Sequence, residues 1–418
     1  MKVLNYSWSD FIEGLKVPSV VFEFLNRAKV WATKMGQFLY LAGGPVRDVL
    51  LGRQTQDIDL VLEGSWESLL STLSKEIEFK IISKSQFLTY KLSLNSLYVL
   101  DLVTARKEFY PSPASLPVVA RGSFIEDIHR RDFTINALIY GLTPPYEDKI
   151  LDLVEGLSDL KKGLIRPLHQ NSFIDDPTRA FRGVRYKVRF NFSYTEEFNK
   201  ALELAAKISS FKKLSPSRLA QELKLFFTKE AMEALPTLLR DLQNLRLLQR
   251  VGLKERRIKS SDFNLLRKAK EELDSKNFEK FVRLFLVELE ETTLKRLAFS
   301  DRERALILKW AQFLREVESS LQDLSILERV ELLEKIPPFL LFRLGLEEKW
   351  EDTIELFWDH WRKVKPAVTG EELKALGIKE GKVIGSILKR LRQEKLEGRL
   401  TTIEEERAFV RNLIFPKS

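Results

Sequence analysis

The sequence has no cysteine, only three histidines and only three methionines among its 418 residues. The lack of cysteine excludes disulfides, thiolate metal ligands and a cysteine nucleophile. The histidines lie far apart, which argues against a zinc site held by closely spaced histidines. No apolar run approaches the roughly 20 residues that a membrane span needs, and the first residues lack the apolar core of a signal peptide. We therefore expect a cytoplasmic protein with no membrane partner.

The residues that are present describe a basic, well-packed chain. Hydrophobic residues make up 44% and charged residues 31%, and the formal net charge is +9. The length exceeds one ordinary core and predicts two to four domains. A positive balance fits a polyanionic partner, although many basic proteins bind no nucleic acid.

Secondary-structure patterns divide the chain into a mixed first part and a helical remainder. Apolar periodicity predicts helices near 18–36 and 65–75. The expected strands lie near 37–42, 57–63, 77–83, 86–94 and 97–103. These elements favour a mixed sheet covered on one face, and the Pro- and Ser-rich segment 104–123 reads as a long loop. Helical spacing then recurs through 178–189, 196–208, 215–228, 230–247, 262–297, 302–324, 326–335 and 350–363.

Two carboxylates, Asp57 and Asp59, stand at the head of an apolar run. Residues i and i+2 of a strand point to the same side, so both acids face one place. Two such groups repel each other unless a cation lies between them, and hard oxygen ligands suit Mg²⁺. The alternative is a solvated strand end or turn, which is the more common fate of an isolated Asp-x-Asp.

The context of this pair favours a functional role. A strand-like run ends at Gly43-Gly44, and a glycine turn lets backbone N–H groups approach a phosphate. Arg47 follows the turn, and Asp101 lies within a later strand-like run, where it could join the two acids around a two-metal site. Together these residues indicate metal-assisted phosphoryl or nucleotidyl transfer.

Arginine-rich clusters follow at residues 126–138 and 175–185. In the first, Arg130 and Arg131 either pair with the preceding acids at helical spacing or form an anion clamp. Asp132 and Asn136, four residues apart, are expected on one helix face, where they could hold a ribose hydroxyl.

In the second cluster, Arg179, Arg182 and Arg185 recur every three residues and share a helix face. Asp176 and Arg179 could present an acceptor beside a donor. Such a pair matches the base-pairing edges of cytosine and adenine and mismatches those of guanine and uracil.

These motifs, from Gly43 to Asp59, from Arg130 to Asn136 and from Asp175 to Arg185, resemble in order and spacing the class II tRNA nucleotidyltransferases. That family comprises the CCA-adding enzymes and their bacterial poly(A) polymerase relatives. The resemblance spans about residues 39–190 and is looser beyond. Asp175 departs from it, because many relatives carry Glu there.

The resemblance implies an α+β fold with a mixed-sheet nucleotidyltransferase head at 1–145, a helical neck at 146–210, a body at 211–365 and a tail at 366–418. It implies that Asp57 and Asp59 hold Mg²⁺ and that Asp101 helps to activate the 3′-hydroxyl of tRNA. The implied nucleotide contacts are Gly43, Gly44, Arg47, Arg131, Asp132, Asn136, Asp176, Arg179, Arg182 and Arg185. In the basic tail the expected tRNA contacts are Lys382, Lys389, Arg390 and Arg392, on its backbone.

The resulting functional prediction is template-independent addition of C, A or both to the tRNA 3′ end from CTP and ATP. The sequence leaves open whether the product is CCA, CC or A, and it leaves the oligomeric state open. A poly(A) polymerase is the nearest alternative, and a catalytically silent RNA-binding protein of the same fold is a second.

Overall fold

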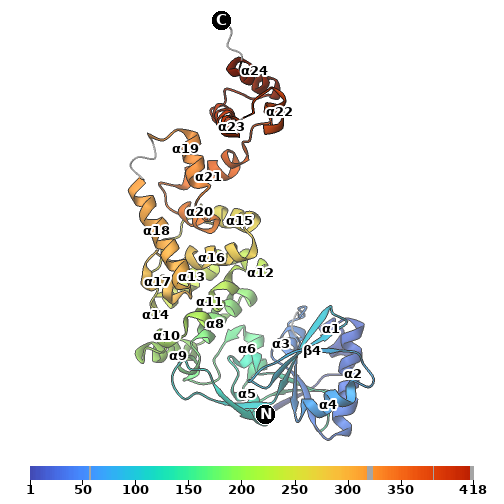
Figure 1. The fold of residues 1–418 in the computed structure, drawn as a ribbon. Coiled ribbons are helices and arrows are strands. Elements are labelled where there is room, and N and C mark those ends of the chain that lie inside the picture. The colour runs from blue at the N-terminus through green and yellow to red at the C-terminus, as the bar shows by residue number, and fades with distance from the viewer. Residues whose placement is uncertain (56–57, 318–322, 380, 415–418) are drawn as a thin grey trace. The chain divides into compact units, whose positions relative to one another are not determined.

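The computed structural model describes residues 1–55, 58–317, 323–379 and 381–414. The chain forms two compact units, Met1–Gly252 and Leu253–Ser418. In Figure 1 the first unit runs from blue to green and contains the sheet, whereas the second runs to red and its labelled elements are helices.

An eight-stranded mixed sheet organises the first unit. Its strand order is β1-β10-β9-β2-β3-β6-β5-β4, and β3 and β6 are its one parallel pair. The strands are β1 Lys2–Asn5, β2 Phe38–Ala42, β3 Asp59–Glu63, β4 Lys80–Lys84, β5 Thr89–Leu94, β6 Tyr98–Thr104, β9 Ile139–Gly141 and β10 Lys149–Asp152. All five predicted strands are therefore confirmed, and three short ones extend the sheet.

Alternation of side chains explains which face of this sheet is covered. In β5, Tyr90, Leu92 and Leu94 are buried, whereas the residues between them are partly or fully exposed. Helices α1 (Trp8–Leu15), α2 (Ser19–Lys34) and α4 (Trp66–Leu73) bury their apolar stripes against the sheet region (Figure 1). On the opposite face, Val61 and Val103 pack in a second core cluster with Phe38, Tyr40 and Ile128. Asp59, Lys91 and Asp101 lie on the same face and are partly or fully exposed, which leaves room for a site.

The segment 104–123, expected to be a loop, contains a hairpin. Strands β7 (Arg106–Phe109) and β8 (Val118–Arg121) pair antiparallel. The prolines of this segment lie between the two strands, where a missing N–H costs no ladder hydrogen bond. The connection is also anchored, because the Ala114 amide donates to the Ile174 carbonyl at 3.0 Å.

Helices form most of the rest of the first unit, as predicted, together with a short parallel pair of strands, β11 Leu164–Ile165 and β12 Ser193–Tyr194. The helices include α5 Phe124–His129, α6 Gly156–Lys162, α7 Ser172–Asp175, α8 Thr178–Phe190, α9 Glu196–Lys207, α10 Ser210–Lys213, α11 Pro216–Lys224, α12 Lys229–Met232, α13 Leu235–Asn244 and α14 Leu247–Arg250. The rings of Phe133, Phe173 and Phe198 pack together in the buried core, and Phe181 of α8 is also fully buried.

The second unit is helical throughout its described residues. Its α-helices are α15 Asp262–Glu272, α16 Ser275–Phe285, α17 Glu291–Arg296, α18 Asp301–Val317, α19 Ile326–Leu333, α20 Pro338–Leu344, α21 Glu351–Asp359, α22 Gly370–Ala375, α23 Gly381–Leu396 and α24 Ile403–Ile414. The helical pattern of 262–297 divides into three helices, and Asp274 caps the second by accepting from the amides of Lys276 and Asn277.

No helix within the described residues is long and apolar enough to cross a membrane. The head sheet continues to Asp152 through β10, past the expected boundary at residue 145. The finer division into head, neck, body and tail stays a prediction.

Candidate functional site

Two of the three predicted acids lie side by side. Asp59 opens β3, and the parallel register places it directly beside Asp101 of β6. Neighbouring strands lie about 4.8 Å apart and residues in register share a face, so both carboxylates project from the same surface. Asp57 lies outside the described residues.

The predicted glycine turn meets these acids at the end of β2. Gly43 has a φ of 72°, in the left-handed region that favours glycine. A Cβ atom built there would lie 2.9 Å from the Arg131 guanidinium, 3.3 Å from the Asn136 carbonyl oxygen and 4.0 Å from Asp59 Oδ2. The turn therefore brings backbone, the Arg131 guanidinium and the Asp59 carboxylate to one place. Gly44 follows as the first residue of α3 (Gly44–Leu50).

Arg47, in α3, was predicted to contact the triphosphate, but its side chain is buried within the protein. Its side chain is 4% exposed, its Nε donates to Asp48 Oδ1 at 2.8 Å, and its guanidinium also donates to Asn136 Oδ1. The guanidinium lies over the Phe190 ring, 4.6 Å from the ring centroid. In this structure Arg47 joins the glycine turn to α8 through protein contacts.

The expectation that Asp132 and Asn136 share a helix face is wrong. Helix α5 ends at His129, Phe133 is extended, and Asn136 closes a short 3-10 turn. The two side chains nevertheless meet, because Asn136 Nδ2 donates to Asp132 Oδ1 at 3.0 Å. The turn achieves the contact because the Thr134 amide donates to the Arg166 carbonyl, which pulls the chain out of the helix.

Asp132 is the centre of a buried chain of polar contacts. Its Oδ2 accepts from Arg182 Nε at 2.8 Å, and Arg182 donates onward to the Tyr186 hydroxyl at 2.8 Å. Burial alone would raise the pKa of Asp132, but Arg182 and the Asn136 amide outweigh it and lower the pKa to about 2. The carboxylate is therefore ionised at neutral pH and ties the end of the sheet region to α8.

Arg130 and Arg131 both pair with Asp127, whose side chain is fully buried. Arg130 approaches Asp127 Oδ1 at 2.7 Å and Arg131 approaches Oδ2 at 2.8 Å. Burial favours a higher pKa for Asp127, but the two guanidinium groups lower it to about 2. Glu126 instead caps α5 through Ser123. Ion pairing at helical spacing is thus present, and it leaves one edge of Arg131 beside Gly43.

The second arginine cluster lies on α8, where each arginine contacts a different element. Arg179 donates to Ser172 Oγ at 2.9 Å and to the Arg130 carbonyl at 2.8 Å. Arg182 meets Asp132, and Arg185 donates to Glu222 of α11 at 2.8 Å. Asp176, just before α8, accepts from the Thr178 hydroxyl at 2.6 Å. The structure thus brings the two predicted arginine clusters together.

Sequence reasoning missed two partners of the expected base-reading pair. Tyr110 accepts from Arg179 at 3.3 Å, and Arg218 donates to Asp176 Oδ1 at 2.5 Å and to the Ala114 carbonyl at 3.2 Å. Burial raises the pKa of Tyr110. Arg218 belongs to the segment 214–223, where the family resemblance is looser, but the sequence assigned neither it nor Tyr110 to this site. Their contacts depend on the connection between β7 and β8 folding back onto α7.

In the second unit, two of the four predicted tRNA contacts are paired with acids. Lys389 lies 2.8 Å from Glu331 of α19, and Arg392 lies 2.5 Å from Glu334, the residue that follows α19. Arg390 instead lies over the Phe409 ring at 5.7 Å, and Lys382 is exposed on α23. The basic residues therefore both hold α23 against α19 and present charge to solvent.

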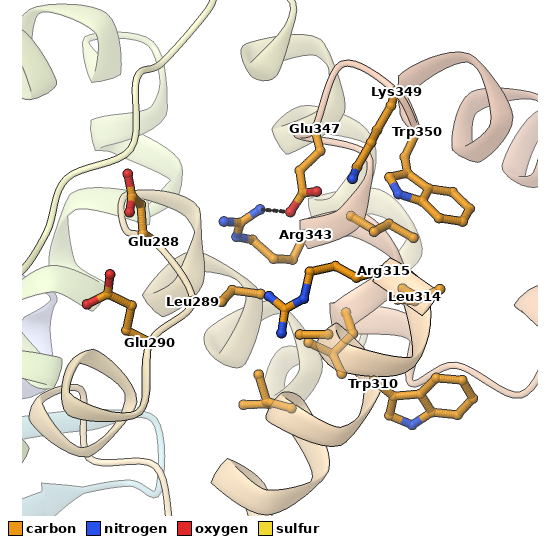
Figure 2. A pocket seen from close by; sticks show the side chains of 14 residues that line it. Glu288, Leu289, Glu290, Trp310, Leu314, Arg315, Arg343, Glu347, Lys349 and Trp350 are labelled. Atoms are coloured by element: carbon orange, nitrogen blue, oxygen red, sulfur yellow. Dashed lines mark hydrogen bonds and ion pairs between the residues drawn. The ribbon is translucent and has the colours of Figure 1, made fainter. Parts of the chain in front are cut away.

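The same unit contains a cavity of about 410 Å³ that none of the predicted site residues lines (Figure 2). Arg343 and Trp350 belong to its wall, and the guanidinium of Arg343 lies 3.4 Å from Glu347. Burial lowers the pKa of Arg343 to about 10. The cavity is distinct from the carboxylates of the first unit and adds nothing to their chemistry.

The carboxylate pair fits a divalent cation by the chemistry of its donors. Within the described residues, which omit Asp57, no group of three or more metal-ligating side chains is present. Asp59 and Asp101 supply hard oxygen donors on one face, beside a glycine turn suited to phosphate. The donor set therefore suits a divalent cation beside a phosphate.

Comparison with known proteins finds similar tRNA nucleotidyltransferases. The family model described as the poly A polymerase head domain matches residues 39–166. The A-adding tRNA nucleotidyltransferase of Halalkalibacterium halodurans is 29% identical over 93% of this chain and 92% of its own length. That of Aquifex aeolicus is 30% identical over 85% of this chain, which spans 44% of the Aquifex protein. A solved CCA-adding enzyme in an apo form superposes with a TM-score of 0.77 at 26% identity, covering 98% of this chain and 99% of that one.

Proposed function

Since the chain belongs to the class II tRNA nucleotidyltransferases, we propose that it adds nucleotides to the 3′ end of tRNA without a template. The observation that carries this function is the placement of Asp59 beside Asp101 and against the Gly43 turn. These three elements bring carboxylates and backbone N–H groups to one face of the sheet. Such a face suits transfer of a nucleotide from a nucleoside triphosphate to an RNA hydroxyl.

In the proposed reaction, the terminal 3′-hydroxyl attacks the α-phosphate of the incoming triphosphate, a new P–O bond forms, and pyrophosphate leaves. Asp101 orients the attacking hydroxyl and accepts its proton as the new bond forms, while the bond between the α-phosphorus and the bridging oxygen breaks. Gly43 and Gly44 let the triphosphate approach the backbone. The Nη1 edge of Arg131, which donates to the Asn136 carbonyl at 3.4 Å, supplies positive charge beside it. Asp132 and Asn136 fix the sugar region.

The metal ion is Mg²⁺ in this proposal, held by Asp57 and Asp59. When bound, it offsets the negative charge that develops on the leaving pyrophosphate.

Selection of the base falls to Asp176 and Arg179. An acceptor and a donor held side by side match the edges of adenine and cytosine. Arg218 fixes the acceptor and Ser172 fixes the donor, so the pair is rigid before the nucleotide arrives. Arg182 and Arg185 support the pocket through Asp132 and Glu222.

We favour adenosine as the nucleotide added, onto a tRNA that already ends in CC. Both curated relatives described above are A-adding enzymes, and one of them matches this chain over nearly its whole length. The solved CCA-adding structure shares the fold at lower identity and supports complete CCA addition as the second candidate. The basic residues Lys382, Lys389, Arg390 and Arg392 contact the tRNA backbone in this proposal, in the cytoplasm where tRNA matures.

Incorporation of labelled ATP and CTP into three tRNA transcripts tests the function. The transcripts end at the discriminator base, at C and at CC. Activity confined to ATP on the CC-ended transcript supports A addition, whereas growth of the first transcript to CCA makes the chain a complete CCA-adding enzyme. Long adenosine tails on unrelated RNAs would identify a poly(A) polymerase.

Catalysis by the carboxylates is tested with Asp59→Asn and Asp101→Asn. Each change removes one negative charge at constant shape, and we expect incorporation to fall by at least about a thousandfold. Binding of tRNA, measured by filter retention, should stay within about twofold of wild type. Unchanged incorporation in either variant would refute the assignment of the site.

A further inference from the structure

A lysine stands beside the carboxylate pair on the same face of the sheet. Lys91 of β5 lies directly opposite Asp101 of β6 in the antiparallel register, and Asp101 lies beside Asp59 of β3. The three residues therefore form a row across three strands. Lys91 Nζ lies 3.0 Å from Asp101 Oδ1, and its side chain is 53% exposed.

The surface beyond this row carries positive charge. Strands β4 and β5 contain no acidic residue. Lys80 of β4 lies opposite Ser93 of β5, and Ser93 shares a face with Lys91 two positions away. Val99 of β6 lies opposite Ser93 and is 52% exposed. From the catalytic acids towards the edge of the sheet, the face thus passes from negative to positive within two strand spacings, about 10 Å.

An RNA end placed on this face has matching chemistry. Its terminal hydroxyl belongs at Asp101 under the proposed function, and the phosphodiester that precedes that nucleotide must lie within one nucleotide of the hydroxyl. Lysine is a common ligand of backbone phosphates, which it contacts without reading sequence. A phosphate that approached Asp101 without a nearby cation would be repelled by both acids.

We propose that Lys91 is a positioning residue that binds the backbone phosphate next to the 3′-terminal nucleotide, with Lys80 extending the same track. In the free protein Lys91 pairs with Asp101, and the arriving phosphate takes over part of that interaction. This inference rests on the proposed function, because it needs the RNA 3′ end to lie at Asp101.

The chain offers a closely matched control. Lys84 lies on the neighbouring strand β4, its side chain is 57% exposed, and its Nζ lies 2.9 Å from Glu67. Lys84 is opposite Tyr90, whose side chain belongs to the covered face, so it points away from the acids. Lys84→Met removes the same charge and a similar ion pair from the other side of the sheet.

Binding is measured for Lys91→Met, Lys91→Arg and Lys84→Met over a range of KCl concentrations, without nucleoside triphosphate. The RNAs are a tRNA ending in CC and the same tRNA without its two terminal cytidines. For the CC-ended RNA, we expect Lys91→Met to weaken binding about two- to fivefold and to reduce the salt slope by about 0.7, one single-strand phosphate contact. Lys91→Arg should retain binding, and Lys84→Met should match wild type. The shortened RNA should show a smaller Lys91→Met effect.

Kinetics separate this role from an effect transmitted through Asp101. A phosphate contact predicts that Lys91→Met raises the KM for tRNA at nearly constant kcat. Equal salt slopes for Lys91→Met and Lys84→Met, or a loss of kcat at unchanged KM, would overturn the inference. So would an equal loss of binding on both RNAs. Failure of the wild-type protein to add nucleotides would instead reject the proposed function.

Discussion

Replacing Asp132 with Asn tests whether the buried polar chain between the sheet region and α8 stabilises the first unit. The substitution keeps the shape of the side chain and removes the charge that faces Arg182 at 2.8 Å. A carboxyl whose pKa falls from 3.8 to about 2 on folding contributes roughly 2 kcal/mol at neutral pH. We therefore expect the free energy of unfolding to fall by about 2 kcal/mol, which corresponds to a fall in Tm of about 4–8 °C for a unit of this size.

The pH dependence has a definite sign. Because folding depresses the pKa of Asp132, its contribution is complete above about pH 5 and is lost as the pH falls towards 2. The difference between wild type and Asp132→Asn should thus be about half as large at pH 3 as at pH 7. Urea unfolding at both pH values measures it, with the exposed Glu13→Gln as a control expected to change stability by less than about 0.5 kcal/mol.

A double-mutant cycle with Arg182→Gln identifies the partner. If Arg182 supplies the stabilisation, the two single changes are coupled by about 1–3 kcal/mol. A loss below about 0.5 kcal/mol for Asp132→Asn, or a difference that does not narrow at low pH, would refute the reasoning.

Two further changes probe the turn and the base pocket. Gly43→Ala should lower the free energy of unfolding by about 1–3 kcal/mol and raise the KM for ATP, because φ is 72° and the added Cβ would lie 2.9 Å from Arg131. Gly52→Ala, at a similar φ in open space, is the control that separates backbone strain from loss of the triphosphate site. An equal KM for ATP in both variants would contradict that site. Asp176→Asn should reduce the preference for ATP over UTP by about tenfold in kcat/KM, because an amide can present a donor where the carboxylate accepts. Competition between ATP and UTP measures this preference. An unchanged preference would show that Asp176 does not read the base.

Strands that show alternation or a longer apolar run, such as β5 and β2, were predictable from the sequence, and very short strands were not. The alternation of Tyr90, Leu92 and Leu94 identifies β5 directly. Strand β9 has three residues, all buried, and β1 has four, all exposed, so neither shows a period of two. Their places in the sheet depend on pairing with β2 and β10, which local pattern does not encode.

The acids of the site were predictable for a related reason. Asp59 and Asp101 each belong to an apolar strand-like run, and parallel pairing of those strands brings the acids together. The conformation around Asp132 was not predictable, because the spacing of Asp132 and Asn136 fits a helix. The backbone there instead bonds to Arg166, and Phe133 pairs with Pro167. Tertiary contacts thus overrode a local pattern that was itself favourable.

The three arginines of α8 show how a helix face can belong to both architecture and chemistry. Arg179 reaches the carbonyl of Arg130, Arg182 reaches Asp132, and Arg185 reaches Glu222. The first two contacts end on the segment that also carries Arg131, whose guanidinium lies beside Gly43. Rotation of α8 would break contacts on both sides at once, so the proposed base pocket and the carboxylate face hold a fixed relation. A base of the correct size and hydrogen-bonding edge can meet Asp176 and Arg179 while the phosphates of the same nucleotide reach the glycine turn. An incorrect base would misplace the phosphates, so base selection is coupled to catalysis without a template.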